Sequence, residues 1–286
     1  IGIPAVVGSH ETTPQWVFFT DRGPEPTALA DGPVHADYVD AVADIAHVRH
    51  VTNWFNGVSV DADAPQAAQL RALPFVRSVG NVATFETPPP VTDHAAPAPP
   101  NPFERPSRAT SLDYGPSITQ DTLINADALH DMGRTGDGVL IGFLDSGFNY
   151  LDHPAFAHVT VVDQWDFVDT NDVVAYGSST DHGTEVMSCA VAYSPGNLIG
   201  TAYNADVALA RTEYEPVEKR IEAEDYWVAG AEWLVDSVGV DVISSSVIYN
   251  WFDPGWGPDF TFDQADGNST IITRTADKAA GKGVVV

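Results

Sequence analysis

The sequence predicts a three-layer α/β fold with a mostly parallel sheet, preceded by a small α+β domain. Strands alternate with helices after residue 138, an order that builds a parallel sheet with ligands bound at the strand carboxyl ends. Upstream, eight of the twenty residues from Thr87 to Pro106 are proline, which favours extended polyproline and excludes a sheet interior. We therefore expect domains at 14–86 and 113–286, joined by a linker at 87–112.

The N-terminal domain is predicted to begin with a strand and to contain two helical units. Val39, Val42, Ile45 and Val48 recur at helical spacing and predict one long helix. The expected elements are strand Gln15–Thr20, helix His35–Val51, strand Trp54–Val60, helix Ala64–Leu73 and strand Phe75–Phe85. This order suits an open-faced α/β sandwich. Periodicity alone leaves its function open, and a generic interaction domain is the alternative.

The C-terminal domain is predicted from short apolar runs, which are typical of strands buried on both faces of a parallel sheet. The expected strands are Val139–Leu144, Val207–Ala210 and Val240–Val247, and the expected helices are Gly183–Ala192, Glu222–Val238 and Thr270–Ala280. The final apolar run, Gly283–Val286, resembles a buried strand cut in the middle. Together with Ile1 at the other end, it indicates a fragment.

Composition excludes some partners. Forty acidic and thirteen basic residues give a formal charge of -27, which repels nucleic-acid phosphates. No stretch approaches the roughly 18 apolar residues of a membrane span. The acids are spread along the chain, as on a solvated surface; the alternative is adaptation to high salt, since a Debye length of about 3 Å at 1 M relieves self-repulsion. The single cysteine, Cys189, is predicted to be a buried structural thiol.

Two tripeptides predict hydrolytic chemistry. A strand ends in Asp-Ser-Gly at Asp145, and a helix opens with His-Gly-Thr at His182. A hydrolytic triad needs a base and a carboxylate that fixes the tautomer of the base, and Asp145 and His182 fit these roles. Either tripeptide alone is more typical of a turn-forming aspartate or a helix-capping polar residue. Their order along the chain favours the catalytic interpretation.

With the helix that contains Glu232-Trp233 and the strand Val242–Val247, these motifs resemble those of subtilisin-like serine peptidases. The segments Trp54–Val60 and Leu73–Val79 look like the inhibitory propeptide of that family. The resemblance implies a subtilisin-like three-layer fold behind a ferredoxin-like propeptide, with Asp145 and His182 catalytic. It also implies that Ser246 and Val247 border the specificity pocket through their backbone. Ile248 and Tyr249 stand where many members have glycines.

The family also implies partners. Its propeptide templates folding and lays its tail, here Phe85–Pro90, in the cleft until it is cut. The expected partners are therefore polypeptide substrates and the chain's own propeptide, and secretion is implied. Members often bind calcium, but Asp152, Asp163 and Asp166 match no calcium-loop spacing. We assign no metal and no cofactor.

The sequence holds no serine in the family's nucleophile motif. The oxyanion asparagine and the Gly-Thr-Ser motif of the family would follow Val286, and no Gly-x-Ser-x-Gly elbow occurs. Ser146, Ser188 and the 244–246 run are explained by packing or turns. The first hypothesis is an endopeptidase acting through an acyl-enzyme, and the second is a non-catalytic fragment or pseudopeptidase acting as a folding chaperone or binding module. His153 is expected to be structural.

Overall fold

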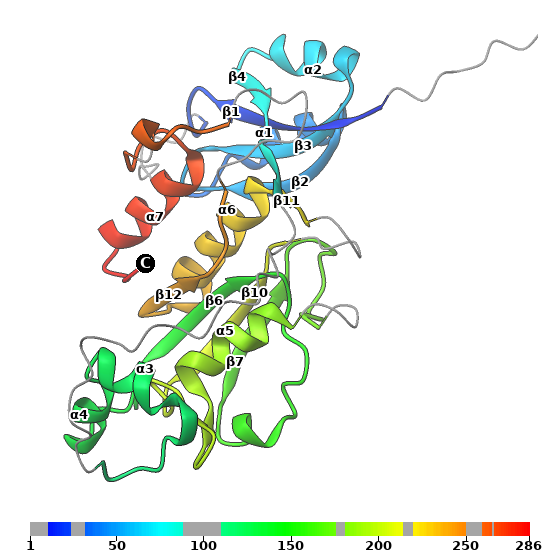
Figure 1. Cartoon of the computed structure of the whole chain (residues 1–286). Helices are drawn as coiled ribbons and strands as arrows, with labels where there is room; N and C mark the ends of the chain where they lie inside the picture. Colours follow the sequence, from blue (N-terminus) through cyan, green and yellow to red (C-terminus); the bar gives the residue numbers. More distant parts are fainter. Residues whose placement is uncertain are drawn as a thin grey trace, which may run out of the picture.

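The computed structural model describes residues 11–23, 32–87, 110–175, 181–213, 220–249, 259–264 and 266–286. Two bodies lie one above the other, an antiparallel domain at the top and a parallel α/β domain below, with α6 and α7 between the two sheets (Figure 1). This architecture confirms the predicted fold class.

The N-terminal domain is a four-stranded antiparallel sheet in the order β2-β3-β1-β4. Its elements are β1 (Thr13–Phe19), α1 (Ala36–Ala43), β2 (His47–Thr52), β3 (Gly57–Ala62), α2 (Ala64–Arg71) and β4 (Val76–Asn81). Successive side chains of a strand point to opposite faces. Accordingly, Val17 and Phe19 of β1 pack in one core with α1, whereas Trp16 and Phe18 pack in the core that contains α6.

The single helix predicted over His35–Val51 is wrong, because α1 ends at Ala43 and the chain returns as β2, paired with β3. The apolar positions themselves were assigned correctly: Val42 is fully buried, and Val39, Ile45 and Val48 pack against the same core. Pairing with β3 overrides the helical period after Asp44. Strand β3 also begins later than predicted, because residues 53–56 form a turn with Asn56 at φ 54°.

The C-terminal domain is built on a parallel sheet in the order β12-β6-β10-β7. Its elements are η1 (Gly115–Ser117), α3 (Ile118–Leu123), α4 (Ala126–Asp131), β6 (Leu140–Asp145), η2 (Pro154–Phe156), β7 (Val161–Asp166), α5 (His182–Val191), β8 (Tyr193–Ser194), β9 (Leu198–Ile199), β10 (Asp206–Arg211), α6 (Glu224–Glu232), the π-helix η3 (Trp233–Val238), β12 (Val242–Ser245), η4 (Phe262–Gln264) and α7 (Ile271–Gly281). A separate pair joins β5 (Thr84–Thr87) to β11 (Arg220–Ala223).

Helices cover both faces of this sheet. Along β10, Val207 and Leu209 pack with α5, and Ala208 and Ala210 pack with α6 and α7. Helix α6 packs very closely against the sheet, since a Cβ on Gly230 of this helix would lie 2.6 Å from Cδ2 of Leu144 on β6. The layers therefore leave the carboxyl ends of the strands at one edge.

Three details depart from the sequence prediction. Strand β7, at one edge of the sheet, was not predicted. The predicted helix Glu222–Val238 begins only at Glu224, and its last six residues widen into the π-helix η3, which ends at Gly239 with φ 79°. Cys189 is exposed, so its assignment as a buried thiol was wrong. Among the described residues, no helix has the length and apolar character needed to cross a membrane.

The close approach of α6 predicts that Gly230→Ala destabilises the protein. Its methyl group would meet Leu144 and Thr212, at 2.6 and 2.8 Å, and overpacking a core costs about 1–3 kcal/mol. Gly281→Ala, at the end of α7, is the control, because its Cβ would meet nothing within 4 Å. Thermal unfolding should show a lower midpoint for Gly230→Ala alone. Equal midpoints for the two variants would contradict this packing.

Candidate active site

Asp145 lies at the carboxyl end of β6 with only 1% of its surface exposed. Its Oδ1 accepts hydrogen bonds from the Ser146 backbone N–H at 2.8 Å and from the Ser146 hydroxyl at 3.3 Å. Its Oδ2 is buried without a hydrogen-bond partner among the described residues. The carboxylate is thus fixed through one oxygen at a sharp turn.

His182 is the first residue of α5, and its Nδ1 lies 2.7 Å from Oδ1 of Asp145. The helix approaches β6 because residue 183 is a glycine, where a Cβ would lie 2.4 Å from the carbonyl oxygen of Gly147. The hydroxyl of Thr184 donates to the carbonyl of Asn149 at 2.6 Å and ties the same helix turn to the loop after β6. The small residues of the His-Gly-Thr tripeptide therefore allow and fix the approach.

This geometry sets the tautomer of His182. An ionised carboxylate only accepts hydrogen bonds, so Nδ1 donates to Asp145 and Nε2 carries the basic lone pair. The His182 side chain is 31% exposed, whereas that of Asp145 is 2% exposed. A base at the surface backed by a buried carboxylate can take a proton from a nucleophile and hold the imidazolium that forms.

Ser246 and Val247 follow β12, whose Ser245 pairs with Leu144 of β6 in parallel register. They therefore lie at the same sheet edge as Asp145. Ser246 is exposed, and Val247 lines a mostly apolar pocket of about 510 Å³. The pocket is completed by Ile248, Tyr249, Phe260, Thr261, Phe262, Gln264, Thr270, Ile272 and Thr273. Whether Ser246 and Val247 bind substrate stays a prediction.

Two of the acids considered as calcium ligands have other partners. Asp166 pairs with Arg211 at 2.5 Å, and Oδ1 of Asp163 accepts the N–H of Gln164. No group of three or more His, Cys, Asp or Glu side chains that could hold a metal ion occurs in the part of the chain that the structure describes. His153 caps η2, where its Nδ1 accepts the N–H of Ala155 at 3.2 Å, as a structural role requires.

The N-terminal domain docks on α6 through buried carboxylates. Oε1 of Glu224 accepts the Trp16 indole N–H at 3.0 Å and the Ala83 N–H at 3.1 Å. Burial raises the pKa of Glu224 to about 7, against 4.5 for a free glutamate. Next to it, Asp225 accepts two hydrogen bonds from Arg49, at 2.8 and 3.2 Å. Such a bidentate pair fixes orientation as well as position.

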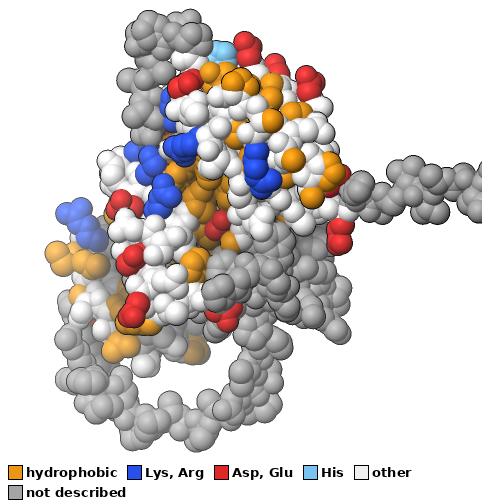
Figure 2. Space-filling view, turned by 90° about the horizontal axis from the view of Figure 1, so that it is seen from above, with side chains coloured by type: hydrophobic (Ala, Val, Ile, Leu, Met, Phe, Trp, Pro, Cys, Tyr) orange, Lys and Arg blue, Asp and Glu red, His pale blue; other side chains and the backbone are white. Residues whose placement is uncertain are grey.

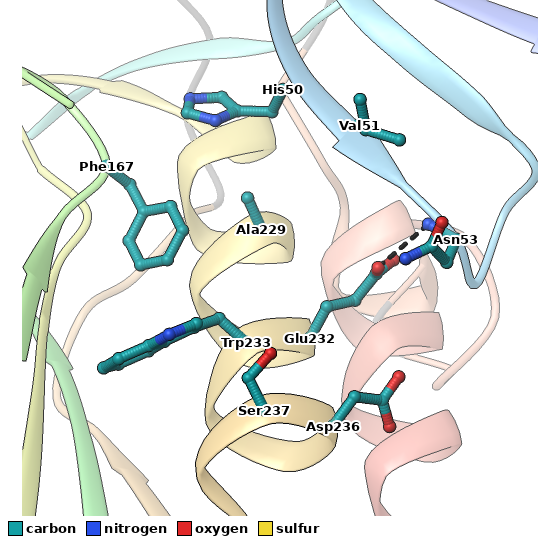
Figure 3. A pocket seen from close by; sticks show the side chains of 9 residues that line it. All are labelled: His50, Val51, Asn53, Phe167, Ala229, Glu232, Trp233, Asp236 and Ser237. Atoms are coloured by element: carbon teal, nitrogen blue, oxygen red, sulfur yellow. Dashed lines mark hydrogen bonds between the residues drawn. The ribbon is translucent and has the colours of Figure 1, made fainter. Parts of the chain in front are cut away.

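At the other end of α6, Glu232 receives three donors from the last residue of β2 and the turn that follows it. They are the Thr52 hydroxyl, the Asn53 N–H at 2.9 Å and the Trp54 N–H at 3.1 Å. Beside this contact, residues of both domains line a pocket of about 220 Å³, with Phe167 and Trp233 on one side and Asn53 and Glu232 on the other (Figure 3). His50 also lines this pocket. Burial lowers the pKa of His50.

Cations on α7 and just after its end complete the interface. The guanidinium of Arg274 lies 5.0 Å from the ring centre of Phe55, and the ammonium of Lys282 lies 5.3 Å from that of Trp54. Lys282 also pairs with Asp236 at 3.1 Å. Figure 2 shows, from above, several Lys and Arg side chains gathered beside hydrophobic ones on part of the surface. Few cations are available in this acidic chain, and several of them stack on aromatic rings of the N-terminal domain.

The predicted inhibitory tail falls partly within the described residues. The β5 strand pairs antiparallel with β11, from Thr84 opposite Ala223 to Thr87 opposite Arg220. Residues 88–90 of the tail lie outside the described residues. The chain thus runs from the N-terminal domain onto the segment that leads into α6.

Sequence reasoning identified the Asp145–His182 pair but missed the residues that join the domains. Arg49 and Asp225 are 176 residues apart, and Trp16 and Glu224 are 208 apart, so no local pattern connects them. One signal was present: Glu224, Asp225 and Glu232 are acids in a segment otherwise apolar enough to be buried. Buried charges require partners, so these acids indicate a contact surface.

Comparison with known proteins identifies the family. Residues 136–286 match the model described as "Subtilase family", and residues 25–95 match "Peptidase S8 propeptide domain, Bacteroidota". The chain belongs to the subtilase family and carries its propeptide domain. Neuroendocrine convertase 2 of Mus musculus is 27% identical over 169 residues, which cover 56% of this chain and 24% of that protein. The Homo sapiens convertase gives the same identity and coverage.

Solved structures share the fold. Fervidolysin from Fervidobacterium pennivorans, a keratinolytic enzyme related to subtilisin, superposes with a TM-score of 0.61 at 18% identity, over 98% of this chain and 40% of that chain. The epidermin leader peptide processing serine protease of Staphylococcus aureus gives 0.57 at 13% identity, over 96% and 60%. The chain spans about a quarter of the length of the curated relatives it matches.

The contact at residue 183 predicts that Gly183→Ala separates His182 from Asp145. The new methyl group would lie 2.4 Å from a backbone oxygen, so the first turn of α5 must shift. A crystal structure of the variant should show Nδ1 and Oδ1 farther apart than the roughly 3.2 Å upper range of a hydrogen bond. Gly80→Ala, in open space on β4, is the control. An unchanged 2.7 Å separation in Gly183→Ala would contradict the argument.

The pKa of Glu224 predicts a pH dependence of stability. Because burial raises the folded-state pKa from 4.5 to about 7, the contribution of Glu224 to stability is complete below pH 4.5 and is lost as the pH rises through 7. Glu224→Gln cannot ionise but keeps an acceptor for Trp16 and Ala83. The difference in unfolding free energy between wild type and variant should therefore shift in favour of the variant between pH 4.5 and 7.

Denaturant unfolding across this pH range measures that difference. Glu185→Gln, on the exposed side of α5, serves as the control for the same carboxylate-to-amide change at a surface position. Parallel stability curves for the wild type and Glu224→Gln would show that Glu224 does not titrate in this window.

Proposed function

We propose that this chain is the precursor portion of a subtilisin-like serine endopeptidase, held inactive by its own N-terminal domain. The observation that carries the proposal is the 2.7 Å contact between His182 Nδ1 and the buried carboxylate of Asp145, at the open edge of a subtilase sheet. The chain covers a quarter of the curated relative and 40% of the fervidolysin chain. We therefore place the serine nucleophile in a longer protein, after Val286.

In the proposed reaction, His182 acts as the general base. Nε2 takes the proton of the serine hydroxyl as its oxygen attacks the scissile carbonyl, and Asp145 stabilises the imidazolium through Nδ1–H. His182 then gives the proton to the leaving amine, which produces an acyl-enzyme. Water, deprotonated by the same base, hydrolyses the ester. No step needs a metal ion.

The N-terminal domain is proposed to be the inhibitor, with bounds 14–86 and a linker at 87–112 before the peptidase domain. The propeptide match at 25–95, the carboxylates of α6 that receive its donors and the β5–β11 pair support this assignment. Polypeptides would be the substrates, with Ser246 and Val247 in the cleft wall. A secreted enzyme is consistent with such a propeptide.

A second function is supported by the same interface. The contacts of α6 and α7 with the N-terminal domain use none of the atoms of the catalytic pair. A fragment or pseudopeptidase without a nucleophile would therefore retain them and could act as a folding chaperone or binding module.

Expression of the longer protein tests the proposal. His182→Ala and Asp145→Asn should prevent release of the N-terminal domain, and Asp145→Asn should lower kcat on a peptide by about 10⁴-fold, because the wrong tautomer of His182 is then favoured. The control is His153→Ala, which removes only the cap of η2 and should be processed normally. Normal processing of His182→Ala would contradict self-cleavage. A longer protein without a serine nucleophile would favour the second function.

A further inference from the structure

Arg211 lies at the end of the central strand β10 and is completely buried. Its neighbours in register are Asp145 on β6 and Asp166 on β7. A buried cation thus stands between the strand that carries the candidate catalytic carboxylate and the edge strand of the sheet. Neither the motifs nor the proposed mechanism accounts for it.

The guanidinium joins the loops that follow these two strands. Its Nε donates to the carbonyl of Ser146 at 3.1 Å, and one terminal nitrogen donates to Asp166 Oδ2 at 2.5 Å and to Asp169 Oδ2 at 2.9 Å. Asp166 is itself held, since its Oδ1 accepts the N–H groups of Val168 and Asp169 at 2.8 and 3.0 Å. The guanidinium of Arg211 is therefore hydrogen-bonded to a carboxylate, that of Asp166, which is itself held in place.

The contact with Ser146 reaches the catalytic pair through one residue. The Ser146 N–H donates to Oδ1 of Asp145, the same oxygen that accepts Nδ1–H of His182. The backbone supports the same turn, because the Thr212 N–H donates to the Asp145 carbonyl at 2.9 Å. Fixing the Ser146 carbonyl therefore fixes the direction in which the Asp145 carboxylate points.

Stability alone does not explain a buried Arg–Asp pair. Desolvating two charges can cost more than their attraction returns, and apolar replacements of such pairs are often neutral or stabilising. A lysine would not be equivalent here, because a single ammonium lacks the planar fork that reaches Ser146 and Asp166 in different directions.

We propose that Arg211 is a positioning residue for the Asp145–His182 pair, acting through the Ser146 carbonyl and anchored by Asp166. The importance of Arg211 for catalysis rests on the proposed peptidase function. Its effect on the geometry of the Asp145–His182 pair does not depend on that function. Arg211 aligns Asp145 so that the tautomer and the orientation of His182 are set before substrate binds.

The primary test uses NMR of the 286-residue chain, in which the proton of His182 Nδ1–H should give a downfield resonance protected from exchange with water. Arg211→Lys and Arg211→Met should lose this resonance while their unfolding stays cooperative. Asp166→Asn should broaden it. The matched control is Asp169→Asn, because the Asp169 side chain is 47% exposed and its loss leaves the contacts with Ser146 and Asp166 intact.

Retention of the resonance in a folded Arg211 variant would overturn the proposal. Unfolding of both Arg211 variants would overturn it too, because Arg211 would then be required only for folding. In the longer protein, Arg211→Lys should lower kcat by about 10²-fold with KM unchanged, the cost of a small misplacement of a catalytic group. If that protein hydrolyses nothing, the proposed function fails while the resonance still decides the role of Arg211.

Discussion

The hydrogen bond between Asp145 and His182 is the interaction around which the C-terminal domain is arranged. Its atoms come from the end of β6 and the start of α5, separated by 37 residues. Three constraints bring them to 2.7 Å: the missing side chain at Gly183, the turn at Ser146 and the sheet that buries Asp145. A buried carboxylate whose Oδ2 has no hydrogen-bond partner among the described residues is costly, and His182 is the partner that offsets part of that cost.

A second constraint connects the domains. Helix α6 packs on the sheet with its small residues and presents Glu224, Asp225 and Glu232 to the N-terminal domain. These carboxylates are nearly fully buried where the two domains meet, so removing the N-terminal domain would expose them to water. Some of the many acidic residues of this chain therefore bind the N-terminal domain. Because these carboxylates accept the hydrogen bonds of the interface, its stability depends on their protonation.

Local sequence was enough to predict the elements that carry the candidate catalytic pair. The apolar run before Asp145 and the small residues after His182 each determine their own element, and the structure places both as expected. Prediction failed where pairing with another strand decides the structure: β2 forms because β3 pairs with it, although its valines follow a helical period. Edge strand β7, with its mixed polar pattern, gave no strong signal.

The proposed positioning role of Arg211 and the contact of Arg49 with α6 could not be predicted, because their partners lie far away in the sequence. Arg211 meets Asp166 and Asp169, which are 45 and 42 residues away. Arg49 meets Asp225 of the other domain, which is 176 residues away. Cys189 illustrates the reverse error, because an apolar neighbourhood in sequence did not mean burial on the helix.

Labelling with a fluorophosphonate, which reacts only with an activated serine, tests the central claim most directly. The account predicts that the longer protein, freed of its N-terminal domain, takes up one label per chain and that His182→Ala takes up none. Equal labelling of both proteins, or no labelling of the wild type, would contradict a catalytic role for the Asp145–His182 pair.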